Sequence, residues 1–299
     1  MNAVKSLLLA ISVTFTVAAS AQNFQQNQNR LPEIGTAGGA IMSIDRERLI
    51  GDFYMRQIRA TAPLISDPAL DEYIADMGNR MVRHADGVRF PFSFFWINNN
   101  DINAFAFLGG HVGVHTGLIL EAQNESELAA VIGHEIAHVT QRHMVRNIEQ
   151  QSQNSGLTLA SVLGALLLGI ANPELGSAAL TATMAGNQQS VINYTRLYEQ
   201  EADRVGMTIL SNAGFDPRGA PNFFGRLADR YRYSTKMPEM LMTHPVTESR
   251  IADTRARAQM LPHPNSPPSL KFALAKARVQ ARYGGVDADT FRRRLDVSR

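Results

Sequence analysis

The segment His134-Glu135-Ile136-Ala137-His138 constrains this chain more than any other part of it. Two histidines four residues apart on a helix place their imidazoles on one side, one turn from each other, as two ligands of a single zinc ion require. The glutamate between them fits the general base of a metal-dependent hydrolase. The pattern therefore predicts one zinc ion per chain, with His134 and His138 as ligands and Glu135 as a catalytic residue.

The surrounding residues predict that this helix begins near Asn124, because Asn124 followed by Glu127 is typical of a capping box. The two histidines lie roughly 140° around the helix from its apolar stripe, so we interpret them as ligands rather than as core residues. The stripe consists of Leu128, Ile132, Ile136 and Val139. His143 falls close to this stripe and is interpreted as a structural residue or as a cap of the helix end.

A catalytic zinc site usually has a third protein ligand. In one known arrangement that ligand is a histidine six residues after the second one, with a glycine between them. Met144 and Gln141 stand at those two positions, so this arrangement is excluded. The third ligand must then come from another helix.

A predicted helix around residues 194–209 supplies a carboxylate, since Glu199 and Asp203 lie four residues apart on one side of it. We predict Glu199 as the third ligand and Asp203 as a residue that orients a ligand or stabilises the transition state. Glu201 points away from both. The alternative is an exposed acidic helix face, paired with Arg196 and Arg204.

These two metal motifs, His134–His138 and Glu199-Gln-Glu-Ala-Asp203-Arg-Val-Gly, resemble those of the gluzincin metalloproteases that include HtpX and the CAAX-processing proteases. Asn103-Ala-Phe-Ala106 with Gly109-Gly110 is similar to a further segment of that family, with Leu108 where the family has proline. The resemblance covers roughly residues 30–260 and implies a zinc metalloprotease domain, to which we assign residues 32–260.

The fold class implied is α+β: a mainly helical zincin-like domain with a small β-sheet beside the active-site helix. Residues 92–97 and 111–116 predict two strands. In zincin-like folds a strand edge beside that helix binds extended substrate by β-augmentation. His111 and His115 share one side of the second strand, and we interpret them as surface histidines rather than as part of the cleft.

The stretch His244-Pro-Val-Thr-Glu-Ser-Arg250 is similar to the His-Pro segment of the same family. His244 could fill the open coordination position of the zinc ion, which would keep the enzyme latent until this loop moves. The alternative is a histidine that lies on the surface or beside the ligands. The sequence leaves both open.

The resemblance also implies a function: periplasmic hydrolysis of misfolded or stalled envelope and outer-membrane proteins, with chaperone activity and contact with the outer-membrane assembly machinery. Two other classes stay open. The first is a zinc-stabilised chaperone or binding module without significant proteolysis. The second is a membrane-associated protease of the HtpX type.

Residues 1–21 predict a cleavable signal peptide rather than a membrane anchor, because Lys5 precedes a short apolar run that ends in Ala19-Ser20-Ala21. Residues 22–31 are polar and predict a disordered linker. The chain has no cysteine, so it forms no disulfide and carries no cysteine-linked lipid, which fits the periplasm. A formal net charge of +2 does not indicate binding to nucleic acid.

Three further segments organise the rest of the chain. Residues 156–171 carry no charge, and the stretch 156–186 predicts either a buried helical hairpin or a lid or peripheral membrane contact. Residues 261–269 form a proline-rich linker. Residues 270–283 and 287–295 predict two basic amphipathic helices, either a remnant of a helical-repeat module or helices packed on the protease domain.

Overall fold

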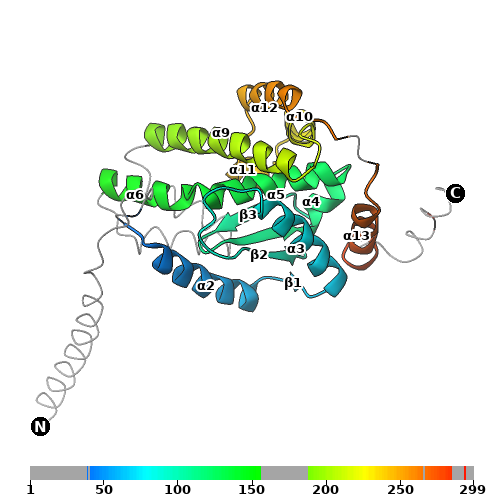
Figure 1. Ribbon diagram of the computed structural model, residues 1–299, viewed down its shortest axis with the longest axis horizontal. Helices are drawn as coiled ribbons and strands as arrows, with labels where there is room; N and C mark the ends of the chain where they lie inside the picture. The colour runs from blue at the N-terminus through cyan, green and yellow to red at the C-terminus, as the bar shows by residue number, and fades with distance from the viewer. Residues whose placement is uncertain (1–38, 40, 156–187, 265–266, 285–292, 294–299) are drawn as a thin grey trace, which may run out of the picture.

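The computed structural model describes residues 39, 41–155, 188–264, 267–284 and 293 (Figure 1). The helices are α2 (Ile44–Thr61), α3 (Pro68–Val82), α4 (Thr116–Glu121), α5 (Glu125–Thr140), α6 (His143–Ser155), α9 (Gln188–Asn212), α10 (Gly219–Tyr231), α11 (Glu239–Thr243), α12 (Glu248–Met260) and α13 (Leu270–Arg282). The strands are β1 (Leu64–Ile65), β2 (Ser93–Ile97), β3 (Ala104–Phe107) and β4 (His111–His115). The predicted α+β class is confirmed. The predictions for 1–21, 22–31 and 156–186 lie outside the described residues, as does that for 287–295 apart from residue 293.

The four strands form one mixed sheet in the order β1-β2-β4-β3. Strands β2 and β4 are parallel, and the other two pairs are antiparallel. Strand β4 is therefore internal, so the predicted strand 111–116 does not lie at the edge of the sheet. The edge is β3, which begins one residue after Asn103, and it packs beside α5. The β3–β4 turn passes through Gly109 and Gly110, both at φ 83°, a left-handed conformation that glycine adopts without strain.

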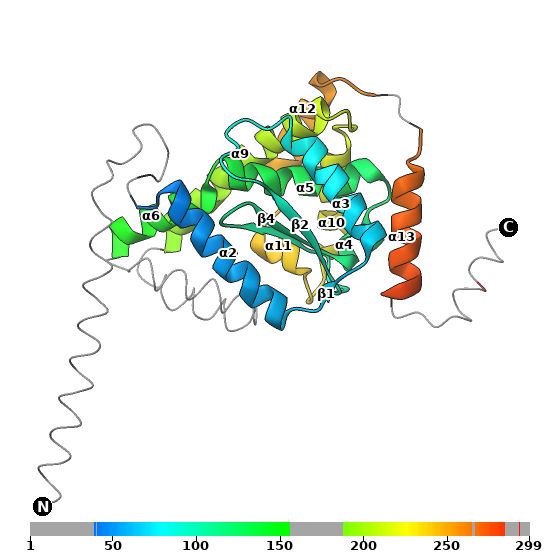
Figure 2. The same ribbon diagram turned by 60° about the horizontal axis from the view of Figure 1, so that its bottom comes forward.

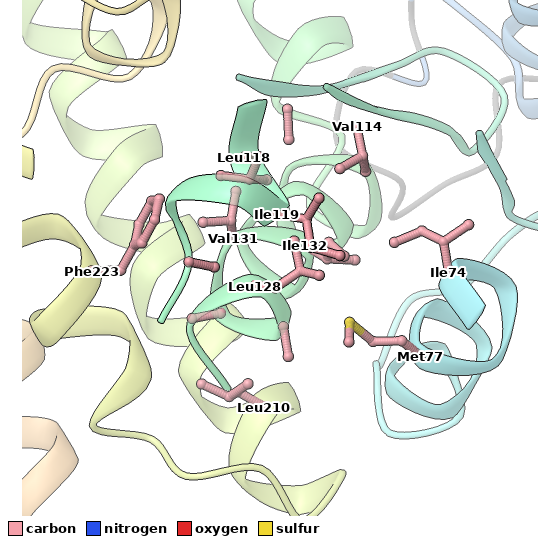
Figure 3. Close-up of a cluster of buried hydrophobic side chains, with 14 of the residues drawn as sticks. Ile74, Met77, Val114, Leu118, Ile119, Leu128, Val131, Ile132, Leu210 and Phe223 are labelled. Carbon is pink, nitrogen blue, oxygen red and sulfur yellow. The ribbon is translucent and has the colours of Figure 1, made fainter. Parts of the chain in front are cut away.

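Helix α5 lies between the sheet and α9, and α2 covers the opposite face of the sheet (Figure 1). In α5 the residues from Leu128 to Ala137 are all buried. An amphipathic surface helix would be exposed on the side opposite its apolar stripe, and α5 is not. Figure 3 shows the packing around Leu128, Val131 and Ile132, to which α3, α4, β4, α9 and α10 all contribute. A helix packed on all sides holds the motif residues rigidly.

The predicted start of α5 is confirmed by its cap. The Asn124 side chain accepts a hydrogen bond from the Glu127 backbone N–H at 3.0 Å. The Glu127 carboxylate in turn accepts from the backbone N–H of Gln123 at 2.8 Å and from Arg226 at 2.7 Å. These bonds satisfy free N–H groups at the helix start and fix the end of α5 that is distant from the histidines.

Helices α5 and α9 cross with their backbones almost in contact. A Cβ added to Gly206 would lie 3.0 Å from the backbone nitrogen of His134, and one added to Gly133 would lie 3.2 Å from the Gly206 carbonyl oxygen. A side chain at either glycine would push the helices apart. The two glycines therefore allow a carboxylate on α9 to reach the histidines on α5.

His111 and His115 are buried, with exposed fractions of 8% and 5%, so their assignment to the surface is wrong. The physical reason is that β4 is internal and α2 covers the face toward which His111 points. The Nδ1 of His111 lies 2.6 Å from the Ser93 hydroxyl, and its Nε2 lies 3.2 Å from Asp52 of α2. His111 thus ties α2 to the sheet.

Helix α13 packs along α3 and α4 (Figure 2). Phe272 and Val279 reach the main hydrophobic core, and Arg278 donates to the buried carboxylate of Asp67 at 2.8 Å. That hydrogen bond is the main reason why the pKa of Asp67 is lowered. These contacts favour the interpretation of 270–283 as a helix packed on the protease domain. Within the described residues, no helix is both long and apolar enough to cross a membrane.

Candidate metal centre

Four side chains from three elements converge on one point: His134 and His138 from α5, Glu199 from α9, and His244 directly after α11. Each offers one donor atom, and these four atoms lie within 4.8 Å of one another. His134 and Glu199 are almost fully buried, with exposed fractions of 2% and 3%. The alternative of an exposed acidic face on α9 is therefore wrong, because Glu199 and Asp203 both point into the protein.

The spacing of these donors fits a small tetrahedral cation. The Nε2 atoms of His134 and His138 are 3.0 Å apart, and the two carboxylate oxygens of Glu199 each lie 3.3 Å from one of them. Bonds of about 2.0–2.2 Å at tetrahedral angles separate neighbouring zinc ligands by roughly 3.3 Å. Two nitrogens and one carboxylate oxygen are also a donor set that zinc accepts.

Glu135 lies beside this cluster without belonging to it. It is 1% exposed, and its Oε1 makes no hydrogen bond within the described part of the chain. The Nε2 of His244 lies 3.6 Å from that oxygen. Buried carboxylate oxygens normally have hydrogen-bond partners, so an unpaired one next to metal-ligand atoms suits a group that must accept a proton.

Asp203 and Arg250 contact residues of the cluster but do not belong to it. Asp203 Oδ1 lies 3.0 Å from His134 Nδ1, the ring atom opposite the one that faces the other donors. Arg250 of α12 donates to both oxygens of Asp203, at 2.7 and 2.8 Å, and its Nη1 lies 2.9 Å from Glu199 Oε2. Partners of this kind fix the orientation of a ligating histidine.

The electrostatics of the cluster favour a cation. Burial opposes charge on His134, yet hydrogen bonds with Asp203 and Glu199 raise the pKa of His134 to about 10. Burial opposes charge on Asp203 as well. The hydrogen bonds with Arg250 and His134 outweigh this effect of burial and lower the pKa of Asp203 to about 2. The pKa of Glu199 is well below its usual value despite burial, chiefly because of His244. The carboxylates are therefore ionised, and a metal ion would replace the proton on His134.

A further histidine, His143, contacts the candidate ligand His138. The Nδ1 atoms of His138 and His143 lie 3.0 Å apart, and the Nε2 of His143 lies 3.2 Å from Glu201. Burial, followed by the charges of His138 and Arg146, lowers the pKa of His143 to about 2, so this imidazole is neutral. His143 is the first residue of α6 and not a continuation of α5.

The contacts of two residues in this arrangement are not predicted by the sequence. Arg250 closes the His244–Arg250 segment, and nothing in its surroundings indicates that an arginine there is buried. His143 was interpreted as a structural residue or helix cap, and only its spacing of five from His138 hinted at contact. A helix break after residue 140 turns it back toward the metal ligands.

Comparison with known proteins gives the following matches. The profile of peptidase family M48 matches residues 68–258. The chain is 54% identical over 265 residues to the putative β-barrel assembly-enhancing protease of Vibrio cholerae, covering 89% of this chain and 55% of that protein. Proteins named β-barrel assembly-enhancing protease are 50% identical in Yersinia pestis (94% and 58% covered) and 47% identical in Escherichia coli K12 (93% and 57% covered). The chain spans a little over half the length of these curated relatives.

Proposed function

Because the chain belongs to peptidase family M48, we propose that it is a zinc-dependent endopeptidase of the bacterial periplasm that cleaves misfolded or stalled envelope and outer-membrane proteins. The observation that carries this proposal is the convergence of His134, His138 and Glu199 beside Glu135, whose buried Oε1 accepts no hydrogen bond within the described residues. The relatives are named β-barrel assembly-enhancing proteases, and we propose β-barrel proteins as the substrate class on that name. We further propose residues 32–260 as the protease domain.

In the proposed mechanism His134, His138 and Glu199 would hold the zinc ion, and the burial of His134 and Glu199 keeps those two side chains from reorienting. A zinc ion at this position would supply Lewis acidity toward the peptide carbonyl and would make water a stronger acid at neutral pH. Glu135 accepts the proton of the attacking water and returns it to the leaving amine. Asp203 keeps the His134 ring in its ligating orientation through its contact with Nδ1.

Strand β3 supplies the proposed substrate-binding edge. It pairs with β4 on one side and ends the sheet on the other, next to α5. An extended peptide can add to such an edge through backbone hydrogen bonds, which select for unfolded segments more than for a particular sequence. This suits a protease that acts on chains that have failed to fold.

Metal removal tests the proposal. We expect the purified protein to cleave casein and an unfolded β-barrel protein, to lose this activity after chelation, and to regain it with one equivalent of zinc. Cleavage that is unchanged by thorough chelation contradicts the zinc mechanism. Suppressed client aggregation without cleavage supports the chaperone alternative. Resistance of the protein to carbonate extraction from membranes supports the membrane-associated alternative.

His244 carries a second, separable proposal, that it keeps the site latent. Its Nδ1 lies 3.0 Å from Glu199 Oε1, and it is the fourth donor of the cluster. It therefore takes the position that substrate or water needs. We expect His244→Ala to increase basal peptidase activity and to weaken zinc binding. Unchanged activity and unchanged zinc affinity in this variant would exclude the latency.

A further inference from the structure

The chain makes an unusual turn between α5 and α6. Arg142 has a φ of 54°, and no other residue except glycine has a positive φ in the described part of the chain. This left-handed position after a helix is usually glycine, because a Cβ is strained there. A strained conformation at a non-glycine residue persists when its surroundings hold it in place, and such residues cluster near functional sites.

The contacts of the Arg142 side chain explain how this backbone conformation is maintained. Arg142 is 5% exposed, and its Nε donates to Glu47 Oε2 at 2.9 Å while its Nη2 donates to the carbonyl oxygen of Met42 at 2.7 Å. Glu47 belongs to α2 and is only 2% exposed. Glycine at position 142 would relax the backbone but leave the Glu47 carboxylate buried without its partner. The buried ion pair therefore ties the α5–α6 break to α2.

The break determines where the next residue lies. His143 is 3% exposed, and its ring stacks on Tyr198 with the ring centres 4.7 Å apart. Its two nitrogens face different partners: Nδ1 lies 3.0 Å from His138 Nδ1, and Nε2 lies 3.2 Å from Glu201. A continuous helix through residues 141–142 would carry His143 away from His138, since residues five apart do not share a helix face.

The hydrogen bonds in this chain of contacts are mutually consistent. Nε2 of His138 faces His134 and Glu199, so the proton of a neutral, ligating His138 belongs on Nδ1. That N–H can donate to Nδ1 of His143, whose own proton on Nε2 then donates to the Glu201 carboxylate. Each atom has one role, and the arrangement leaves His138 Nε2 with its lone pair free toward the metal position.

We propose that Glu47, Arg142 and His143 are positioning residues that orient His138, so that the packing of α2 sets the affinity of the site for its metal ion. This proposal rests on the proposed zinc site. It adds a link between that site and a helix on the opposite face of the sheet (Figure 1). The hydrogen bond to a ligating imidazole fixes its tautomer and ring orientation.

The first test replaces His143 with phenylalanine, which keeps the stacking on Tyr198 but removes both nitrogens. We expect zinc to bind about 10–100-fold more weakly in a competition titration with a chromophoric chelator. We also expect the long-range ¹H–¹⁵N NMR signals of His138 in the metal-free protein to show loss of the fixed Nδ1–H tautomer. His143→Gln, which keeps a polar atom, should recover part of the affinity. His84→Phe, the same change at an exposed histidine, is the control and should change neither.

The second test separates positioning from general stability. The double variant Glu47→Gln/Arg142→Gly removes the ion pair, relieves the backbone strain and leaves no buried charge unpaired, so it should fold. We expect weaker zinc binding and the same altered His138 signals. The control Glu127→Gln/Arg226→Met removes another arginine pair with a buried glutamate at the other end of α5 and should keep wild-type zinc affinity.

The outcomes distinguish the two proposals. Wild-type zinc affinity and His138 signals in both His143→Phe and Glu47→Gln/Arg142→Gly overturn the positioning role while the zinc site stands. Equal losses in the double variant and its control also overturn it, since the effect is then one of stability. A wild-type protein that binds no zinc overturns the proposed function itself.

Discussion

Replacing Glu135 with glutamine is expected to lower the turnover of peptide substrates by about 10²–10⁴-fold, the usual contribution of a general base. Zinc affinity should stay near that of the wild type, because Glu135 is not among the four converging donors. Glutamine has nearly the shape of glutamate, so the buried position should accept it without repacking. It cannot take a proton from water, and that single loss should account for the lower turnover. Turnover of a fluorogenic peptide and zinc content by mass spectrometry measure the two effects.

A matched control is available on the same helix. Glu125 lies in the first turn of α5, partly exposed, where its Oε1 accepts from the Tyr73 hydroxyl at 3.2 Å. Glu125→Gln makes the same chemical change and should leave turnover unchanged. Wild-type activity in Glu135→Gln would show that another group moves the proton. Loss of zinc together with activity would show instead that Glu135 maintains the metal site.

The parts of the site that the sequence predicted are those encoded by helix periodicity. The spacing of four between His134 and His138, and between Glu199 and Asp203, sets which side chains share a helix face whatever the fold. The capping box at Asn124 is equally local. These patterns carry the resemblance to a metalloprotease family, and the match to peptidase family M48 confirms that resemblance. The structure also brings Glu199 to the two histidines, and the roles of these residues stay predictions until they are tested.

The parts that the sequence missed depend on contacts between distant segments. Strand β3 becomes the sheet edge because β4 inserts between it and β2, and no local pattern specifies that order. His111 was placed on the surface because alternation shows which residues share a face but not what covers it. Arg250 reads as an ordinary charged residue of a polar helix, and its burial depends on α9 lying alongside α12.

Removing the charge of Arg250 is expected to have the largest effect on stability. Arg250 is 4% exposed and contacts two carboxylates that are themselves buried, those of Asp203 and Glu199. In Arg250→Met two buried carboxylates lose the guanidinium that neutralises them. Breaking a buried ion pair in this way typically costs about 3–5 kcal/mol of unfolding free energy. Urea denaturation of the metal-free protein measures the loss directly.

Zinc should recover part of that loss, because a divalent cation held by Glu199 supplies the positive charge that the variant lacks, and a ligand that binds only the folded state stabilises it. Arg257→Met is the matched control on α12: its pair with Asp253 is partly exposed, so its removal should cost no more than about 1 kcal/mol. If Arg250→Met loses no more than this control, the carboxylates do not depend on Arg250. If Asp203→Asn, which removes one of the two negative charges, restores stability to Arg250→Met, charge imbalance and not lost packing is the cause.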